Sequence, residues 1–199
     1  MSSDVPKHDA YMFFVFENSM NISEETLTTL NRDMADFFRT LSEVEYNTDM
    51  QVKIIAMEFD DKCRIITKCG PVHVNEFSLL EIKSSNKVPN FGNMLCVLNS
   101  VIKDYCNRSF TKRSFYAHVF IFVTAGSKEK EYLSALDSLN ANRVYKYGTK
   151  IAFAVEDGDN IESIADIVGT VEAVISKENL KLFSWFLRFK WVEVEPLLD

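Results

Sequence analysis

FFVFENSMN, residues 13–21, joins a run of large apolar side chains to an abrupt polar end. The apolar run begins at Tyr11, and a strand that is buried on both faces of a parallel sheet is typically this continuous. Glu17, Ser19 and Asn21 then follow at alternate positions. Their oxygens suggest two hypotheses: a metal site, or the polar end of a buried strand.

The composition indicates one globular domain. Of the 199 residues, 47% are hydrophobic and 16 are Phe, which is enough for a large core. The net charge of -7 argues against a nucleic-acid binder and against adsorption to an anionic membrane. No apolar run approaches the roughly 20 residues of a membrane span. The polar N-terminus lacks a secretory signal, and the four Cys show no zinc spacing. We therefore expect a cytoplasmic protein with a flexible tail over 1–9 and a single domain over 10–199.

Strand and helix patterns alternate along the chain. The patterns predict strands over 11–16, 51–59, 63–69, 117–124, 151–155 and 171–175, and helices over 27–41, 91–105, 128–139, 160–168 and 179–189. Residues 71–82 remain ambiguous. The spacing of 51–59 and 63–69 favours an antiparallel hairpin. The alternation predicts a three-layer, doubly wound α/β fold, with a mostly parallel six-stranded sheet, one antiparallel edge strand and helices on both faces. In such sheets ligands bind beyond the carboxyl ends of the strands, where residues 17–19 and 124–126 fall.

The order of these landmarks resembles a von Willebrand factor A (vWA) domain, and in particular the bacterial TerY-like proteins of the tellurium-resistance group. In that family the first strand ends in Asp-x-Ser-x-Ser, where this chain has Glu17 to Asn21. The family's Thr-Asp-Gly after the fourth strand corresponds to Thr124-Ala125-Gly126, and its Thr loop before a helix corresponds to 89–95. The aromatic stretch 180–191 looks like the closing helix of TerY-like members. The resemblance covers about residues 10–190 and implies a vWA/Rossmann-like fold.

The family's metal-ion-dependent adhesion site (MIDAS) holds a divalent cation on one Asp and two Ser of the first loop, a Thr of the second and an Asp of the third. Carried over position by position, these ligands become Glu17, Ser19, Asn21, Pro89 and Ala125. Pro89 and Ala125 have no side-chain oxygen, although a shift of the loop by one residue would place Asn90 there. Hard cations need several oxygen ligands, some of them anionic. The resemblance therefore implies a vestigial MIDAS with no cofactor and at most weak Mg²⁺ binding.

The sequence suggests no catalytic residue. His8, His73 and His118 fall away from the predicted carboxyl ends, and 126–131 has one Gly, too few for a phosphate loop. We expect a non-enzymatic interaction module that binds a protein partner, in a bacterial stress response related to tellurium resistance. The predicted partner-binding residues are Glu17, Asn18, Ser19, Asn21, Asn90, Asn93, Ser127 and Lys128. The alternative is a nucleotide-binding or hydrolytic enzyme, because this architecture hosts many functions. The oligomeric state stays open.

Overall fold

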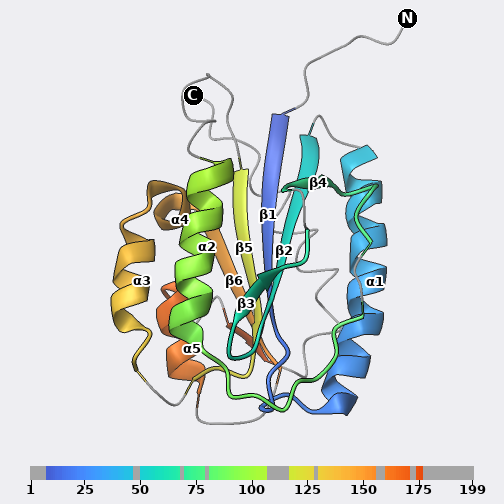
Figure 1. The fold of residues 1–199 in the computed structure, drawn as a ribbon. Coiled ribbons are helices and arrows are strands. Elements are labelled where there is room, and N and C mark those ends of the chain that lie inside the picture. The colour runs from blue at the N-terminus through green and yellow to red at the C-terminus, as the bar shows by residue number, and fades with distance from the viewer. Residues whose placement is uncertain are drawn as a thin grey trace, which may run out of the picture.

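The computed structural model describes residues 8–46, 50–67, 70–78, 81–106, 117–127, 130–155, 160–170 and 174–176. They form one seven-stranded sheet with helices on both faces (Figure 1). The strands are β1 (His8–Glu17), β2 (Met50–Phe59), β3 (Cys63–Ile65), β4 (Val72–His73), β5 (Ala117–Thr124), β6 (Thr149–Ala154) and β7 (Val174–Ser176). The helices are α1 (Glu24–Tyr46), α2 (Phe91–Tyr105), α3 (Leu133–Asn140), α4 (Arg143–Tyr147) and α5 (Ile161–Val168).

The sheet has the order β3-β2-β1-β5-β6-β7, and β4 pairs with β2 as well. β1, β2, β5, β6 and β7 are parallel, whereas β3 and β4 run antiparallel to β2. The predicted three-layer, mostly parallel α/β fold is confirmed. The sequence predicted six strands and the sheet has seven. The additional strand is β4, which lies in the segment 71–82 that the sequence left ambiguous.

Several boundaries differ from the predicted ones. β3 ends at Ile65 rather than at residue 69, since the N–H groups of Ile66 and Thr67 both donate to the carbonyl of Ala56 and interrupt the ladder. β1 begins at His8, inside the segment predicted to be a flexible tail. α4 was not predicted at all. The closing helix predicted over 179–189 lies outside the described residues.

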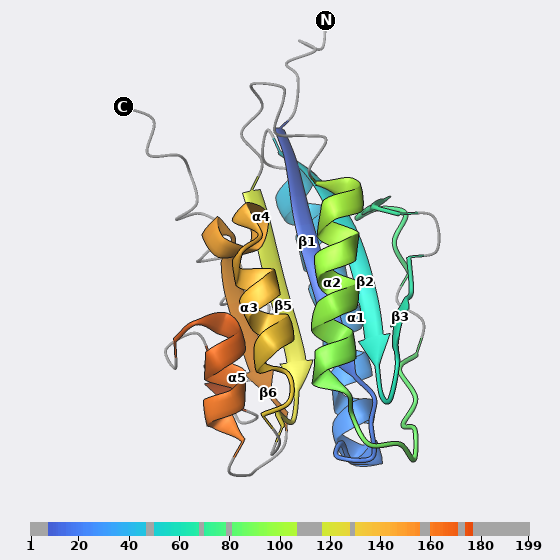
Figure 2. The ribbon, with the colours of Figure 1, turned by 60° about the vertical axis from the view of Figure 1, so that its left-hand side comes forward.

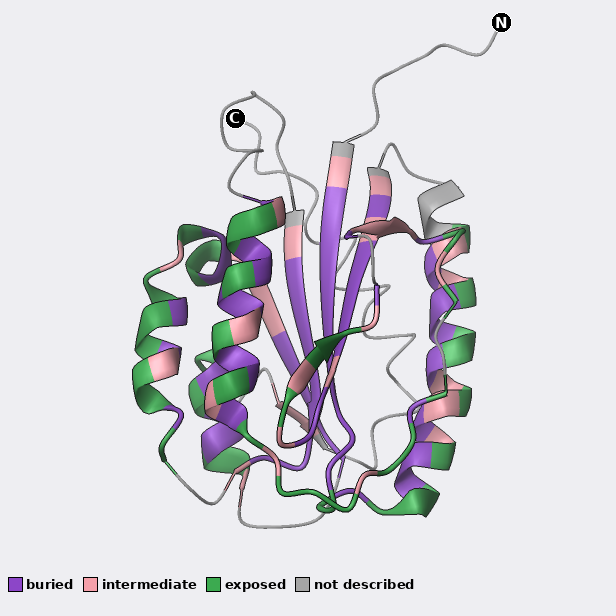
Figure 3. Ribbon diagram, viewed as in Figure 1, coloured by how far each residue is buried: buried purple, intermediate pink, exposed green. Residues whose placement is uncertain are grey.

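Two apolar cores flank the sheet. Phe14 and Phe16 of β1 pack toward α1, whereas Phe13 and Val15 pack toward α2 and the other helices. Figures 1 and 2 show α1 on one face and α2, α3, α4 and α5 on the opposite face. In Figure 3 the strands are mostly buried and the helices expose their outer faces. The continuous apolar run of β1 thus follows from its central place between two helical layers.

A long connection, residues 74–78 and 81–90, links β4 to α2; we call it the strap. Its Phe77 ring packs edge-on against Phe38 of α1, with 4.7 Å between the centroids. Further along, the Asn31 side chain of α1 donates to the Ile82 carbonyl and accepts from the Ile82 N–H, both at 2.9 Å. These contacts attach the strap to α1 and bring its last residues to the carboxyl end of the sheet.

Candidate functional site

Several described segments lie at the carboxyl ends of the parallel strands, and together we call them the rim: residues 18–23, 83–90 and 125–127 with the first turns of α2, α3 and α5. Two hydrogen bonds join the loop after β1 to the strap: the Met20 N–H donates to the Lys87 carbonyl (2.9 Å), and the Ser85 N–H donates to the Asn18 carbonyl (2.7 Å). The Asn18 N–H donates to the carbonyl of Phe59 at the end of β2 (2.9 Å). The rim is therefore a connected surface built from segments far apart in sequence.

Glu17 lies at the centre of the rim and is fully buried, with 0% of its surface exposed. Its Oε1 accepts a hydrogen bond from the Ser19 hydroxyl, and its Oε2 accepts one from the Thr124 hydroxyl and one from the Ala125 N–H (2.9 Å). The adjacent pairing of β1 and β5 explains the meeting of these residues, because Phe16 lies opposite Val123. The structure thus brings together Glu17, Ser19 and Ala125, as the parallel sheet predicted.

Both hydroxyls of this group also accept hydrogen bonds. Ser19 Oγ accepts from the Asn21 N–H (3.1 Å), and Thr124 Oγ1 accepts from the Gly126 N–H (3.0 Å). We call Glu17, the two hydroxyls and the three N–H groups the Glu17 cluster. Its hydrogen bonds run without a break from the loop after β1 to the loop after β5.

These residues do not fit a divalent cation. A cation needs oxygen lone pairs directed at it, whereas both Glu17 carboxylate oxygens face N–H or O–H donors. Position 125 contributes a methyl group in place of a carboxylate. Throughout the described part of the chain, no group of three or more His, Cys, Asp or Glu is arranged to hold a metal ion.

The second predicted loop is also committed to internal contacts. Asn90 Oδ1 accepts from the Asn93 N–H (2.8 Å) and so caps the start of α2. Asn93 Oδ1 accepts from the Cys63 N–H (2.8 Å), which ties α2 to β3. The Asn90 N–H donates to the carbonyl of Asp60 (2.8 Å). The predicted ligand position near Pro89 therefore has a structural explanation in helix capping.

The predicted partner-binding residues divide by exposure. Glu17, Asn18 and Ser19 are buried, so their side chains are not available to a partner. Asn21, Asn90 and Asn93 are exposed at the rim, and Ser127 is half-buried, with its N–H donating to Ser163 Oγ (2.8 Å). Lys128 lies outside the described residues.

The rim carries apolar side chains that the sequence did not single out. Met20 is 58% exposed and Val88 is 65% exposed. Leu133 and Ile161, the first residues of α3 and α5, are exposed there as well. A signal existed for Met20, which is the one apolar residue between Glu17 and Asn21.

An ion-pair group borders the rim at the hairpin of β2 and β3. Arg64 donates to both carboxylate oxygens of buried Asp60 (3.2 and 2.9 Å) and also to Glu58 (3.2 Å). Burial alone would raise the pKa of Asp60, but hydrogen bonds from Arg64 and from the Lys62 N–H hold it well below its usual range. The ion pair of Asp60 with Arg64 therefore stabilises the hairpin of β2 and β3. Lys87 forms an ion pair with the neighbouring Asp61 (2.8 Å).

The described His and Cys residues do not gather at the rim. His118, the second residue of β5, stacks on Tyr11 at the amino end of the sheet. His73 pairs with Lys53 in the amino-terminal half of β2. Burial raises the pKa of the Cys63 thiol and of the Cys106 thiol to about 12, which disfavours the reactive thiolate.

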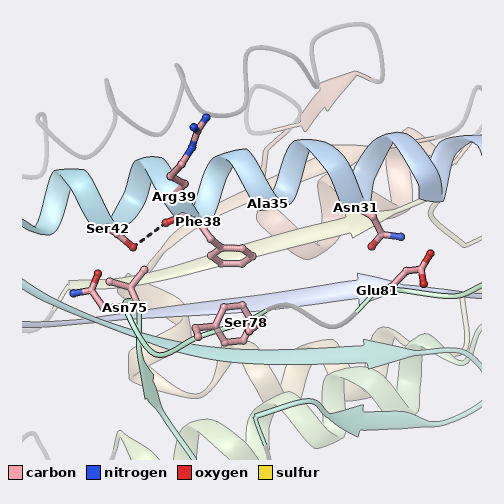
Figure 4. Close-up of a pocket in the computed structure, with 10 residues that line it drawn as sticks. Asn31, Ala35, Phe38, Arg39, Ser42, Asn75, Ser78 and Glu81 are labelled. Atoms are coloured by element: carbon pink, nitrogen blue, oxygen red, sulfur yellow. Dashed lines mark hydrogen bonds between the residues drawn. The ribbon is translucent and has the colours of Figure 1, made fainter.

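A hollow of about 460 Å³ lies between α1 and the strap (Figure 4). Two of its polar side chains already have partners: Asn31 bonds to Ile82, and Ser42 Oγ donates to the Phe38 carbonyl (3.1 Å). In Figure 4 the Arg39 side chain points away from the strap, and it pairs with Asp36 (3.0 Å). The hollow results from the packing of the strap on α1, and among the described residues that line it we identify no group of polar side chains directed at a common ligand.

Comparisons with known proteins support the fold. No protein-family profile matches the chain, and no curated protein matches it in sequence. Proximal thread matrix protein 1 from the mussel byssus, in a structure with a zinc-occupied MIDAS motif, is 12% identical with a TM-score of 0.64, over 91% of this chain and 47% of that one. A von Willebrand factor type A structure from Catenulispora acidiphila is 8% identical with a TM-score of 0.61, over 90% of this chain and 42% of that one. The pilus adhesin SpaC from Lactobacillus rhamnosus GG is 7% identical with a TM-score of 0.63, over 96% of this chain and 30% of that one.

The chain therefore has the von Willebrand factor A fold, as its sequence landmarks predicted, and it spans less than half the length of each of these proteins. Among the described helices, none is long and apolar enough to cross a membrane.

Proposed function

We propose that this chain is a non-enzymatic protein-binding module that presents its rim to a protein partner without a metal ion. The placement of exposed apolar side chains is the observation that supports this function best. Of the six large hydrophobic residues that the described part of the chain exposes, four lie on the rim: Met20, Val88, Leu133 and Ile161. Apolar side chains gathered at one end of a molecule are typical of an interaction surface, whereas single ones scattered over it need no explanation.

The rim segments that carry these side chains adjoin one another. The Met20 N–H is bonded to the residue before Val88. A Cβ at Gly92, in the first turn of α2, would lie 3.9 Å from the Cα of Tyr132, the residue before Leu133. A protein partner could therefore contact several of these side chains at once.

The polar groups of the rim suit the same purpose. Asn21, Asn90 and Asn93 are exposed on the same rim as Met20 and Val88. Apolar contacts with a polar border that can form hydrogen bonds characterise protein–protein interfaces. The structural neighbours include a pilus adhesin and a byssus thread matrix protein, which supports an interaction role for this fold.

The proposal dispenses with the metal because the Glu17 cluster does not fit a cation. The resemblance to TerY-like proteins extends the proposal to a cytoplasmic role in a bacterial stress response related to tellurium resistance. That part rests on the sequence resemblance alone, and growth of a deletion strain on tellurite tests it. Normal tellurite tolerance in the deletion strain would refute it.

The binding function is tested by capture of partners from lysate of the source cells. The wild-type chain is compared with Met20→Ser/Val88→Ser. Tyr147→Ser serves as the control, because Tyr147 is exposed just before the start of β6, at the end of the sheet opposite the rim. We expect a protein that the wild type and the control capture equally, that the double variant loses by about 10-fold or more, equivalent to roughly 1.4 kcal/mol, and that EDTA does not release. Capture that is unaffected by the double substitution would refute the rim as the binding surface, and release by EDTA would refute metal independence.

A further inference from the structure

We infer that the Glu17 side chain takes the place of a cation in this fold, by joining the loop after β1 to the loop after β5 through hydrogen bonds. The inference rests on the proposed function, because it states what holds the rim in shape when no metal is bound. It assigns Glu17 a positioning role rather than contact with the partner, since the side chain is fully buried.

The first step of the argument is the direction of the hydrogen bonds. A cation joins loops by attracting oxygen lone pairs, and an anion can join them by attracting hydrogens. Here the Ser19 hydroxyl from one loop, and the Thr124 hydroxyl and Ala125 N–H from the other, all donate to Glu17. Hydrogen bonds to a charged acceptor are about twice as strong as neutral ones, so one buried carboxylate can hold both loops.

The second step is the orientation of the two hydroxyls. The N–H groups of Asn21 and Gly126 donate to Ser19 Oγ and Thr124 Oγ1, so each hydroxyl accepts from the backbone and donates to Glu17. Hydrogen bonds in such a chain polarise one another. The arrangement directs the hydroxyl hydrogens at the carboxylate, which is opposite to the direction that a cation at the same place would require.

The third step is the length of the side chain. Shortening Glu17 to Asp would withdraw the carboxylate by about one C–C bond, roughly 1.5 Å, from Thr124 and the Ala125 N–H. A carboxylate at position 125, in turn, would place a second negative charge beside the Glu17 carboxylate, which accepts from the N–H of that same residue. Glu at 17 and Ala at 125 therefore suit each other, and Asp at both positions would open space for a cation between two carboxylates.

Amide hydrogen exchange at the rim tests the positioning role. Glu17→Met removes both acceptor oxygens. Glu17→Gln removes one acceptor oxygen and the charge while keeping the shape of the side chain, so the hydrogen bond from the Ala125 N–H is weakened even where the remaining oxygen still accepts it. The matched control is Glu58→Gln, a Glu near the carboxyl end of β2 whose partner is Arg64. We expect the Ala125 N–H to exchange about 10-fold faster in Glu17→Met and faster by a smaller factor in Glu17→Gln, while the amides of β6 and the control protein keep the wild-type rates.

Unchanged exchange at Ala125 in Glu17→Gln would overturn the inference, and this variant decides the question if Glu17→Met does not fold. Faster exchange throughout the protein would overturn it too, because it would indicate general destabilisation instead of a local role at the rim.

Metal binding supplies the second arm of the test, with Mn²⁺ as the probe in calorimetric titration and thermal melting. We expect no heat of binding in the wild type and a melting temperature that Mn²⁺ and EDTA change by less than about 1 °C. In Glu17→Asp/Ala125→Asp we expect saturable Mn²⁺ binding that raises the melting temperature and slows exchange at position 125. Mn²⁺ binding by the wild type, or no Mn²⁺ effect in the double variant, would overturn the inference.

The two proposals fail separately. The role of Glu17 is supported if the wild type binds no Mn²⁺ and the Glu17 variants exchange faster only at the rim, whatever the partner capture shows. Capture that is insensitive to Met20 and Val88 refutes the binding surface and leaves the exchange result unaffected.

Discussion

The Asn31 amide anchors the strap to α1, and its removal should destabilise the protein. Nδ2 donates to the Ile82 carbonyl and Oδ1 accepts from the Ile82 N–H, both at 2.9 Å. Ile82 is only 2% exposed, so water cannot readily replace these bonds. We expect Asn31→Ala to lower the free energy of unfolding.

The size of the effect follows from two opposing terms. Two neutral hydrogen bonds contribute about 1–3 kcal/mol net, and the buried N–H and C=O of Ile82 cost towards the upper end of this range when they lose their partner. Ala forms helices better than Asn by roughly 0.5 kcal/mol, which offsets part of the loss. The expected decrease in the free energy of unfolding is therefore about 1.5–2.5 kcal/mol.

Urea unfolding at neutral pH measures this decrease, and Arg39→Ala on the same helix is the control. The exposed pair of Arg39 with Asp36 should contribute less than about 0.5 kcal/mol. Hydrogen exchange at the Ile82 N–H should also become faster in Asn31→Ala. A decrease below about 0.5 kcal/mol, or an increase, would refute the reasoning, because helix propensity would then outweigh the two bonds.

Three further predictions concern single groups. Gly126→Ala should lower the melting temperature more than Gly169→Ala does: both have positive φ (79° and 88°), but a Cβ at Gly126 would lie 2.6 Å from Asn160, whereas nothing lies within 4 Å at Gly169. The pKa of Asp60 is lowered by its hydrogen bonds, so its contribution to stability is present above about pH 4 and is lost as the pH falls through the folded-state pKa; urea unfolding at neutral and acid pH should therefore show a smaller acid loss in Asp60→Asn than in the wild type. Tyr145→Phe should lower the free energy of unfolding by about 1–2 kcal/mol in urea unfolding, because the buried hydroxyl donates to a backbone carbonyl of α5 at 2.6 Å. The first prediction would be contradicted by equal melting temperatures of the two glycine variants. The second would be contradicted if the wild type and Asp60→Asn lost the same free energy of unfolding at acid pH, and the third if Tyr145→Phe kept the wild-type urea midpoint.

The sequence predicted the long elements because their periodicity is local. β1 reads as a continuous apolar run since it lies between two helical layers, and α2 carries an apolar stripe that packs on the sheet. β4 has two residues, and its place is decided by the pairing of Val72 and His73 with β2. Contacts of that kind join positions far apart in the chain, and no local pattern encodes them.

The candidate site shows the same division. Parallel pairing predicted that Glu17 and Ala125 would meet, because the carboxyl ends of adjacent strands share one edge. Glu17 accepts hydrogen bonds from Thr124 and the Ala125 N–H because Glu is one methylene group longer than Asp. The sequence comparison considered only side-chain metal ligands, so it missed the backbone N–H as a partner. The exposure of Met20 and Val88 was likewise missed, because the exposure of an apolar loop residue depends on which distant segments pack against it, and no local pattern encodes that.

Burial of the Glu17 cluster separates the shape of the rim from its binding chemistry. Every side chain that joins the two loops points inward, so the outer surface of the rim is left to Met20, Val88 and the exposed amides. A domain that uses a cation for both purposes must keep an open coordination position for its partner, and this couples partner binding to metal supply. Here substitutions of exposed rim residues should change partner affinity without changing loop geometry, and substitutions of Glu17 should change loop geometry first and affinity only as a consequence.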